Sequence, residues 1–244
     1  MILYGHRGAR NEAPENTLTG FRHALGKGVE SFEFDVHLTA DDQLAVIHDP
    51  TVDRTTNGKG AVAGMTTAEL ARLDARSIFP EWPEPAGVPT LAEVLDLIGG
   101  AKRMEIEMKT DTPERLARVA ELVMAAIRRY DLAARATVTS FDPVALEAVA
   151  RLAPDQRRGF IGKFDSGADL ATAVRVGARH CAIPIKTGSP ARVREAHAAG
   201  MEVTGWQGNS PEAIATLLDW DVDAITSDYP TMALAVLREA GRLP

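Results

Sequence analysis

Short apolar or β-branched runs alternate with longer amphipathic segments along the whole of this 244-residue chain. Runs of strand character alternating with helical segments indicate parallel strands joined by right-handed crossovers. Eight such units favour an α/β fold, a single (β/α)8 barrel of the TIM type over residues 1–244, with an open doubly wound sheet as the alternative. The predicted strands are ILYGH, SFEFDV, RMEIEMK, ATVTSF, RRGFIG, HCAIPI, EVTGW and DAITSD.

The amphipathic segments between these runs have recognisable helix starts. Leu18, Phe21 and Leu25 share one helical face, and Asn16 is the predicted N-cap of that helix. The TLAE stretch at residues 90–93 has the spacing of a capping box. Further helices are predicted at residues 113–130, 143–152, 168–176, 190–199, 211–218 and 231–240.

The alternation is irregular at one place, where residues 49–89 separate the second strand region from its helix. The Asn57-Gly58 pair indicates a hairpin turn, and a short helix is predicted at residues 66–73. Four prolines follow before the barrel pattern resumes. We therefore expect a small insertion at one end of the barrel, of a size that often has a functional role.

Carboxylates recur at a spacing of two in two of the predicted strands. Glu33 and Asp35 lie on one face of their strand, where two like charges repel unless a cation neutralises them. In RMEIEMK, Glu105, Glu107 and Lys109 share one face. Barrel chemistry takes place at the carboxyl ends of strands, so Glu107 and Lys109 are better candidates than Glu105.

Neighbouring strands could thus bring Glu33, Asp35 and Glu107 around one divalent cation, with Lys109 beside them. Ligands that are all oxygen favour Mg²⁺ or Ca²⁺ over Zn²⁺, which prefers histidine or cysteine. The alternative is a solvated ladder of alternating charge on the surface of the sheet.

Two histidines stand where predicted strands end. His6 closes the first strand, and His48 ends the run before the insertion, which makes this pair a candidate for proton transfer. Arg7 could bind a phosphate, or it could be a structural ion-pair partner, and Gly8 would let the backbone approach a ligand. The other histidines have no such company, and we expect His180 at a strand edge and the rest in solvent: His23, His37 and His197.

Composition narrows the class of protein. The net charge of −7 argues against a nucleic-acid partner, and no apolar run approaches the length of a membrane span. The first residues show no signal-peptide pattern, and the single cysteine, Cys181, fits a reducing compartment, so the cytoplasm is expected. Nucleotide-binding, zinc-protease and serine-hydrolase motifs are absent.

With these residues in view, the chain closely resembles the glycerophosphodiester phosphodiesterase family. The resemblance follows the order of the family over nearly the whole chain, and together its blocks are a specific signal. The blocks are HRGARNEAPENT at residues 6–17, FEFDVHLTADDQLAVIHD at 32–49, DRTTNGKG at 53–60, EIEMK at 105–109 and ITSDYP at 225–230.

The resemblance implies a TIM-type barrel with an insertion and a divalent cation at its mouth. It implies that the enzyme cleaves glycerophosphodiesters, such as glycerophosphocholine, to sn-glycerol 3-phosphate and an alcohol. It implies that the metal is bound by Glu33, Asp35 and Glu107. It also implies that His6 and His48 are the acid-base pair, and that Arg7 and Lys109 contact the phosphate.

The chain departs from the family pattern near its seventh and eighth strands. WQGN at residues 206–209 replaces a common Trp-Thr-Val-Asn run, and ITSD at 225–228 replaces IITD. Because of these departures, the resemblance does not identify which alcohol the enzyme releases. Lysophospholipids, glycerophosphoinositol and sugar phosphodiesters are alternative substrates. The alternative from another class of protein is a barrel that binds phosphate without catalysis. The sequence does not indicate the oligomeric state.

Overall fold

Eight parallel strands close into a barrel in the computed structural model, which describes residues 1–243. The first strand pairs with both the second and the last, and this closes the sheet and confirms the (β/α)8 barrel over the open sheet. A ninth strand, β3, pairs antiparallel with the carboxyl end of β2. The strands are β1 (Ile2–His6), β2 (Ser31–Leu38), β3 (Leu44–Val46), β4 (Arg103–Met108), β5 (Ala136–Ser140), β6 (Arg158–Ile161), β7 (His180–Pro184), β8 (Glu202–Trp206) and β9 (Ala224–Ser227).

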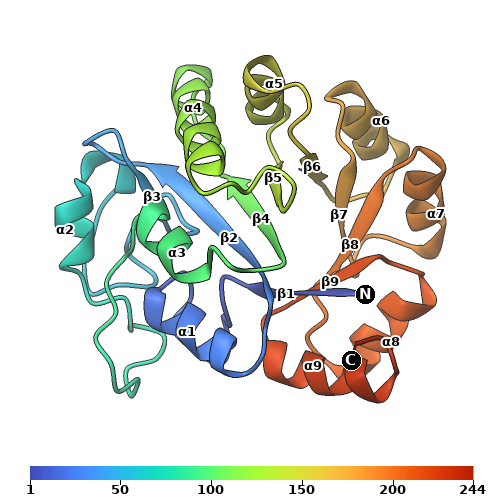
Figure 1. Cartoon of the computed structure of the whole chain (residues 1–244), viewed down its shortest axis with the longest axis horizontal. Coiled ribbons are helices and arrows are strands. Elements are labelled where there is room, and N and C mark those ends of the chain that lie inside the picture. Colours follow the sequence, from blue (N-terminus) through green and yellow to red (C-terminus); the bar gives the residue numbers. More distant parts are fainter. Residues whose placement is uncertain (244) are drawn as a thin grey trace.

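Helices surround the strands on the outside (Figure 1). The predicted helices form within one or two residues of their expected ends, and the capping box at Thr90 is present with both of its hydrogen bonds. No helix within residues 1–243 is long and apolar enough to cross a membrane. The helices are α1 (Leu18–Gly26), α2 (Thr67–Ala71), α3 (Leu91–Ile98), α4 (Pro113–Arg129), α5 (Pro143–Leu152), α6 (Gly167–Arg175), α7 (Pro190–Ala198), α8 (Pro211–Asp219) and α9 (Pro230–Glu239).

The segment between β3 and α3 packs on a small apolar cluster of its own. It contains α2 and a 3-10 turn, Val62–Gly64, and α2 lies at the left edge of the molecule in Figure 1. The hairpin expected at Asn57-Gly58 is reduced to one antiparallel bridge between Thr51 and Ala61. The segment therefore has its own local core, yet its ends stay attached to the barrel.

Strands β2 and β4 carry apolar side chains on their outward faces and carboxylates on their inward faces. Phe32 and Phe34 point outward and pack edge-on against Phe21 of α1, with ring centroids 5.7 and 5.9 Å away. Each buried phenylalanine side chain contributes about 1.5 to 3 kcal/mol to folding. Because side chains alternate along a strand, Glu33 and Asp35 must then face the barrel interior. The apolar outer face thus forces the acids inward.

The loop between β1 and α1 corrects one expectation, the N-cap of α1. Thr17, not Asn16, is the N-cap of α1, because the Thr17 hydroxyl accepts a hydrogen bond from the Gly20 amide. Asn16 has a positive φ of 54° and donates instead to Asp35. Gly8 has a φ of 86°, and a Cβ there would lie 3.3 Å from the α1 backbone, so the backbone conformation and the packing against α1 both favour glycine.

Candidate active site

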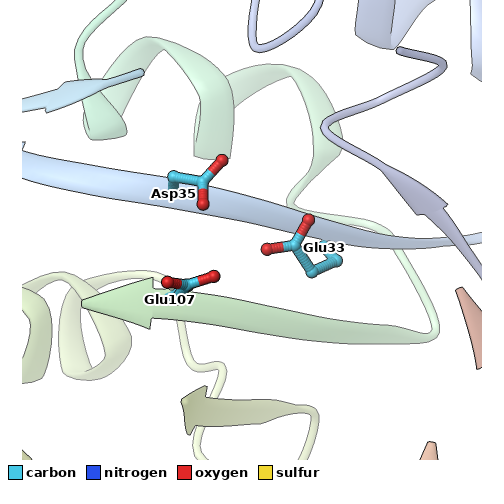
Figure 2. Close-up of side chains that lie close together, drawn as sticks. All are labelled: Glu33, Asp35 and Glu107. Atoms are coloured by element: carbon cyan, nitrogen blue, oxygen red, sulfur yellow. The ribbon is translucent and has the colours of Figure 1, made fainter. Parts of the chain in front are cut away.

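Three carboxylates converge at the carboxyl end of the barrel. Figure 2 shows Glu33 and Asp35 on β2 and Glu107 on the neighbouring strand β4, with Asp35 paired in register with Glu107. One oxygen from each lies within 4.8 Å of the others, and all three residues are buried, Asp35 completely. The surface-ladder interpretation is therefore wrong, because the outer faces of both strands are apolar and covered by helices.

Mutual repulsion of these acids is visible in their pKa values. Burial, followed by the charges of Asp35 and Glu107, raises the pKa of Glu33 well above its usual value. Burial and the Asp35 charge raise the pKa of Glu107 to about 7. Burial also favours a higher pKa for Asp35, but the positive charges of Lys109 and Arg7 outweigh burial and lower the pKa of Asp35. A set of three carboxylates that repel each other fits Mg²⁺ or Ca²⁺, which would relieve the repulsion.

Two cationic side chains border the acids. Lys109 Nζ lies 2.6 Å from Glu107 Oε1 and 3.3 Å from Asp35 Oδ1. Arg7 donates from Nη1 to Glu15 Oε1 at 2.9 Å, while its buried Nε lies 3.3 Å from Asp35 Oδ2 without making a hydrogen bond. Arg7 therefore makes ion pairs with Glu15 and Asp35, and its unused Nε–H remains near the acids.

His6, at the end of β1, stands between two carboxylates. Its Nε2 atom lies 3.6 Å from Glu33 Oε2, and its Nδ1 atom is hydrogen-bonded to Asp228 Oδ1. Asn209 holds Asp228 in turn, donating to Oδ2 at 2.8 Å and accepting from the Asp228 amide at 2.8 Å. Burial lowers the pKa of His6, and Asp228 opposes that effect. The arrangement directs Nε2 toward the acids.

His48 follows β3, which places it beside the end of β2. The Ile47 amide donates to the Asp35 carbonyl at 3.1 Å, and His37 Nε2 donates to the His48 carbonyl at 3.0 Å. The Nδ1 atom of His48 lies 2.6 Å from Asp49 Oδ1. Burial lowers the pKa of His48, and the Asp35 charge opposes this effect.

His37, which we expected in solvent, is instead buried beside His48.

Arg54, from the segment between β3 and α3, joins two parts of the site. Its guanidinium donates twice to Asp49, at 2.6 and 3.1 Å, and twice to Glu15, at 2.9 and 2.8 Å. Asp49 contacts His48 and Glu15 contacts Arg7. The orientation of His48 and that of Arg7 thus depend on the same guanidinium.

One cavity of about 90 Å³ lies among these groups, and five of the residues described above line it. One side is charged, and the other is largely apolar with Phe141 at its rim, 44% exposed and in edge-on contact with Trp206. Lys109 Nζ lies 6.0 Å from the centre of the Phe141 ring. The lining residues are His6, Arg7, Glu33, His48, Glu105, Glu107, Phe141, Ile161, Ala182, Trp206 and Thr226.

Sequence reasoning missed several residues that support this site. Asp228 lies in the ITSDYP block, directly after the last strand. His6 was identified by its position at a strand end, and the same criterion identifies Asp228. Glu15 and Arg54 lie in loops, where neither strand nor helix periodicity applies, and only the fold reveals their contact. Asn209, in the WQGN departure from the family pattern, still reaches Asp228.

Comparisons with known proteins agree with this geometry. The model of the glycerophosphoryl diester phosphodiesterase family matches residues 6–232. A glycerophosphodiester phosphodiesterase of Caldanaerobacter subterraneus subsp. tengcongensis is 32% identical over 241 residues, which cover 98% of this chain and 99% of that protein.

Two solved structures extend the comparison to the fold. A glycerophosphodiester phosphodiesterase from Agrobacterium tumefaciens is 30% identical, with a TM-score of 0.80 over 96% of this chain and 99% of that one. An Oleispira antarctica phosphodiesterase, in complex with the product sn-glycerol-3-phosphate, is 25% identical, with a TM-score of 0.88 over 98% and 97%. The chain therefore belongs to the glycerophosphoryl diester phosphodiesterase family, and it is an enzyme of the phosphoric diester hydrolase class.

Proposed function

We propose that this enzyme hydrolyses glycerophosphodiesters to sn-glycerol 3-phosphate and an alcohol, with the help of a divalent cation. The observation that supports this most directly is one cavity lined by both histidines, Arg7, Glu33 and Glu107, with Asp35 and Lys109 directly beside these residues. The substrate is an anion, and the chain carries a net charge of −7, so the positive charge that binds it must be local. Arg7 and Lys109 supply that local charge.

Glu33, Asp35 and Glu107 are the residues that would hold Mg²⁺ or Ca²⁺. When bound, the ion would neutralise phosphoryl oxygens and lower the pKa of a bound hydroxyl. Arg7 and Lys109 would contact the phosphate from the same end of the barrel, with the unused Nε–H of Arg7 as one donor. Their present ion pairs keep both side chains next to the acids.

His6 and His48 are the proposed proton-transfer pair. One imidazole removes the proton of the attacking hydroxyl, and the other protonates the departing alkoxide, each contributing about 10²- to 10⁴-fold to the rate. Burial lowers both histidine pKa values, which favours the neutral ring that a base requires. Asp228 and Asp49 hold Nδ1 of their respective histidines, so in each ring Nε2 is the atom left for proton transfer.

Soluble diesters suit this cavity better than lysophospholipids. A lipid substrate would call for an exposed apolar rim on residues 49–89, where Phe79 and Trp82 are the aromatic residues. Trp82 instead donates from Nε1 to Thr19 at 2.8 Å and packs on the barrel core, and Phe79 is half-buried. Ile78, 47% exposed, is the one large hydrophobic residue in that part of the segment with high exposure.

We further propose that residues 1–244 form one catalytic domain, with 49–89 as an insertion that supplies Arg54. The cytoplasm remains our proposed compartment. It rests on the single cysteine, Cys181, which is buried and has no second cysteine in the chain with which to form a disulfide.

The test is to incubate the enzyme with glycerophosphocholine, glycerophosphoethanolamine, glycerophosphoinositol and a lysophosphatidylcholine, with Mg²⁺, with Ca²⁺ or with EDTA. We expect sn-glycerol 3-phosphate from the soluble diesters in the presence of a cation and little with EDTA. A parallel thermal unfolding experiment should show a higher melting temperature with the cation, because it binds the folded state. Binding of the diesters without any release of sn-glycerol 3-phosphate would favour the non-catalytic phosphate-binding alternative.

A further inference from the structure

Glu105 is a buried carboxylate in the cavity that has no role in the proposed reaction. It is 2% exposed and lines the cavity together with the catalytic candidates. It lies on the same inward face of β4 as Glu107, two residues and therefore about 7 Å deeper in the barrel. Among residues 1–243 the group of acids able to share a cation consists of Glu33, Asp35 and Glu107, without Glu105.

One oxygen of Glu105 is anchored from the opposite wall of the barrel. The Thr204 hydroxyl donates to Glu105 Oε1 at 2.9 Å, and His180 Nε2 lies 2.8 Å from that hydroxyl oxygen. Burial lowers the pKa of His180 to about 3, so the ring is neutral, and an Nε2–H can donate to Thr204. His180 is thus inside the barrel rather than at a strand edge, and this network fixes the Glu105 carboxylate.

The other oxygen, Oε2, receives no hydrogen bond from residues 1–243. Thr226 on β9, which is 4% exposed, lines the same cavity, and its hydroxyl has no hydrogen-bond partner within that range. Because both residues line the cavity, water or a ligand there can supply the missing hydrogen bonds. The cavity therefore offers one acceptor and one hydroxyl for a ligand hydroxyl group.

Charge decides which end of the substrate reaches this place. Arg7 and Lys109 attract the phosphate to the mouth of the cavity. Every glycerophosphodiester carries two free hydroxyls on its glycerol group, while the alcohol on the other side of the phosphate varies. The hydroxyl-bearing glycerol group matches the deep polar wall, and the variable alcohol is left for the open rim at Phe141.

We propose that Glu105 is a specificity-determining residue that accepts a hydrogen bond from a glycerol hydroxyl, with the Thr226 hydroxyl as a second contact. This inference rests on the proposed hydrolysis of glycerophosphodiesters. The residue selects polyol diesters and orients them with the phosphate toward the acids of the mouth. It takes no part in proton transfer.

The first experiment leaves the protein unchanged. The wild-type enzyme is assayed, with Mg²⁺ or Ca²⁺, on glycerophosphocholine and on 2-hydroxypropyl phosphocholine, which lacks the terminal hydroxyl. We expect kcat/KM to be about 10- to 100-fold lower for the analogue, because the Glu105 acceptor is then left unpaired. Calorimetry should show a similar loss of affinity when 1,2-propanediol 1-phosphate replaces sn-glycerol 3-phosphate.

The second experiment changes the residue. Glu105→Leu and Thr226→Val should bring the two substrates toward equal kcat/KM, mainly by raising KM for glycerophosphocholine, with little change for the analogue. Glu30→Gln is the control, because Glu30 pairs with Lys102 on the exposed surface, and it should keep the wild-type preference.

The outcomes separate the two proposals. If wild-type enzyme hydrolyses both compounds equally well, the assignment of Glu105 is wrong while the proposed function stands. If it hydrolyses neither, the proposed function fails and this inference fails with it. A preference that survives unchanged in Glu105→Leu would also overturn the assignment.

Discussion

His6 and Asp228, which are 222 residues apart in sequence, form a direct hydrogen bond between Nδ1 and a carboxylate oxygen. Barrel closure causes this contact: β1 and β9 pair in parallel with Gly5 opposite Ser227, so the next residue on each strand emerges at the same end. The proposed proton-transfer group at the start of the chain therefore depends on the last strand for its orientation.

Replacement of that carboxylate by an amide, Asp228→Asn, should lower kcat by about 10²-fold, because His6 loses the partner that fixes its tautomer. The increase in melting temperature on adding Mg²⁺ should stay, since Asp228 is not one of the converging acids. Nitrogen-15 NMR of the ring would show whether the proton has left Nδ1. The control is Asp223→Asn, which disrupts an exposed pair with His197 and should leave kcat unchanged.

Removal of either imidazole should stop turnover without removing the cation site. His6→Asn and His48→Asn should each reduce kcat by about 10²- to 10⁴-fold, while the shift in melting temperature with Mg²⁺ or Ca²⁺ persists. His23→Asn is the control, because His23 lies outside the cavity near Glu12. Full activity in either test variant would remove that histidine from the proposed mechanism.

Cation affinity should depend on pH around neutrality. Burial and repulsion raise the pKa of Glu107 to about 7 and that of Glu33 above its usual value, so both carboxyls take up protons as the pH falls. A cation must displace those protons, so its affinity should weaken as the pH falls below 7, by about tenfold per pH unit for each proton displaced. Calorimetric titration with Ca²⁺ at pH 6, 7 and 8 measures this slope. Equal affinities at all three values would contradict the proposed ligand set.

Loss of the guanidinium that links His48 to Arg7 should affect both stability and catalysis. In Arg54→Met, Asp49 and Glu15 lose their charged hydrogen bonds, and we expect unfolding free energy to fall by about 1 to 3 kcal/mol and kcat by about tenfold. Urea denaturation and steady-state kinetics measure the two effects. Arg118→Met is the control, because Arg118 pairs with Asp42 and Glu121 on the exposed surface and should change neither quantity appreciably.

The parts of this fold that sequence could predict are those governed by periodicity. Alternation along β2 and β4 identified the inward acids Glu33, Asp35 and Glu107, and strand ends identified His6 and His48. The contacts of Asp228 and Arg54 could not be predicted in this way, because they depend on which strands become neighbours and on how a loop folds back. Sequence also misjudged Asn16, whose side chain serves Asp35 rather than the helix that follows.

The charged half of the cavity comes mainly from β1, β2 and β4 and the loops beside them, while its apolar wall comes from the ends of β5 to β8. Under the proposed function, mutations at Phe141, Ile161, Ala182 or Trp206 would reshape the space around the released alcohol, while the strands that carry the proposed cation ligands keep their sequence. Such a division would let substrate preference change through one side of the barrel alone. The reaction itself would be inherited intact on the other side.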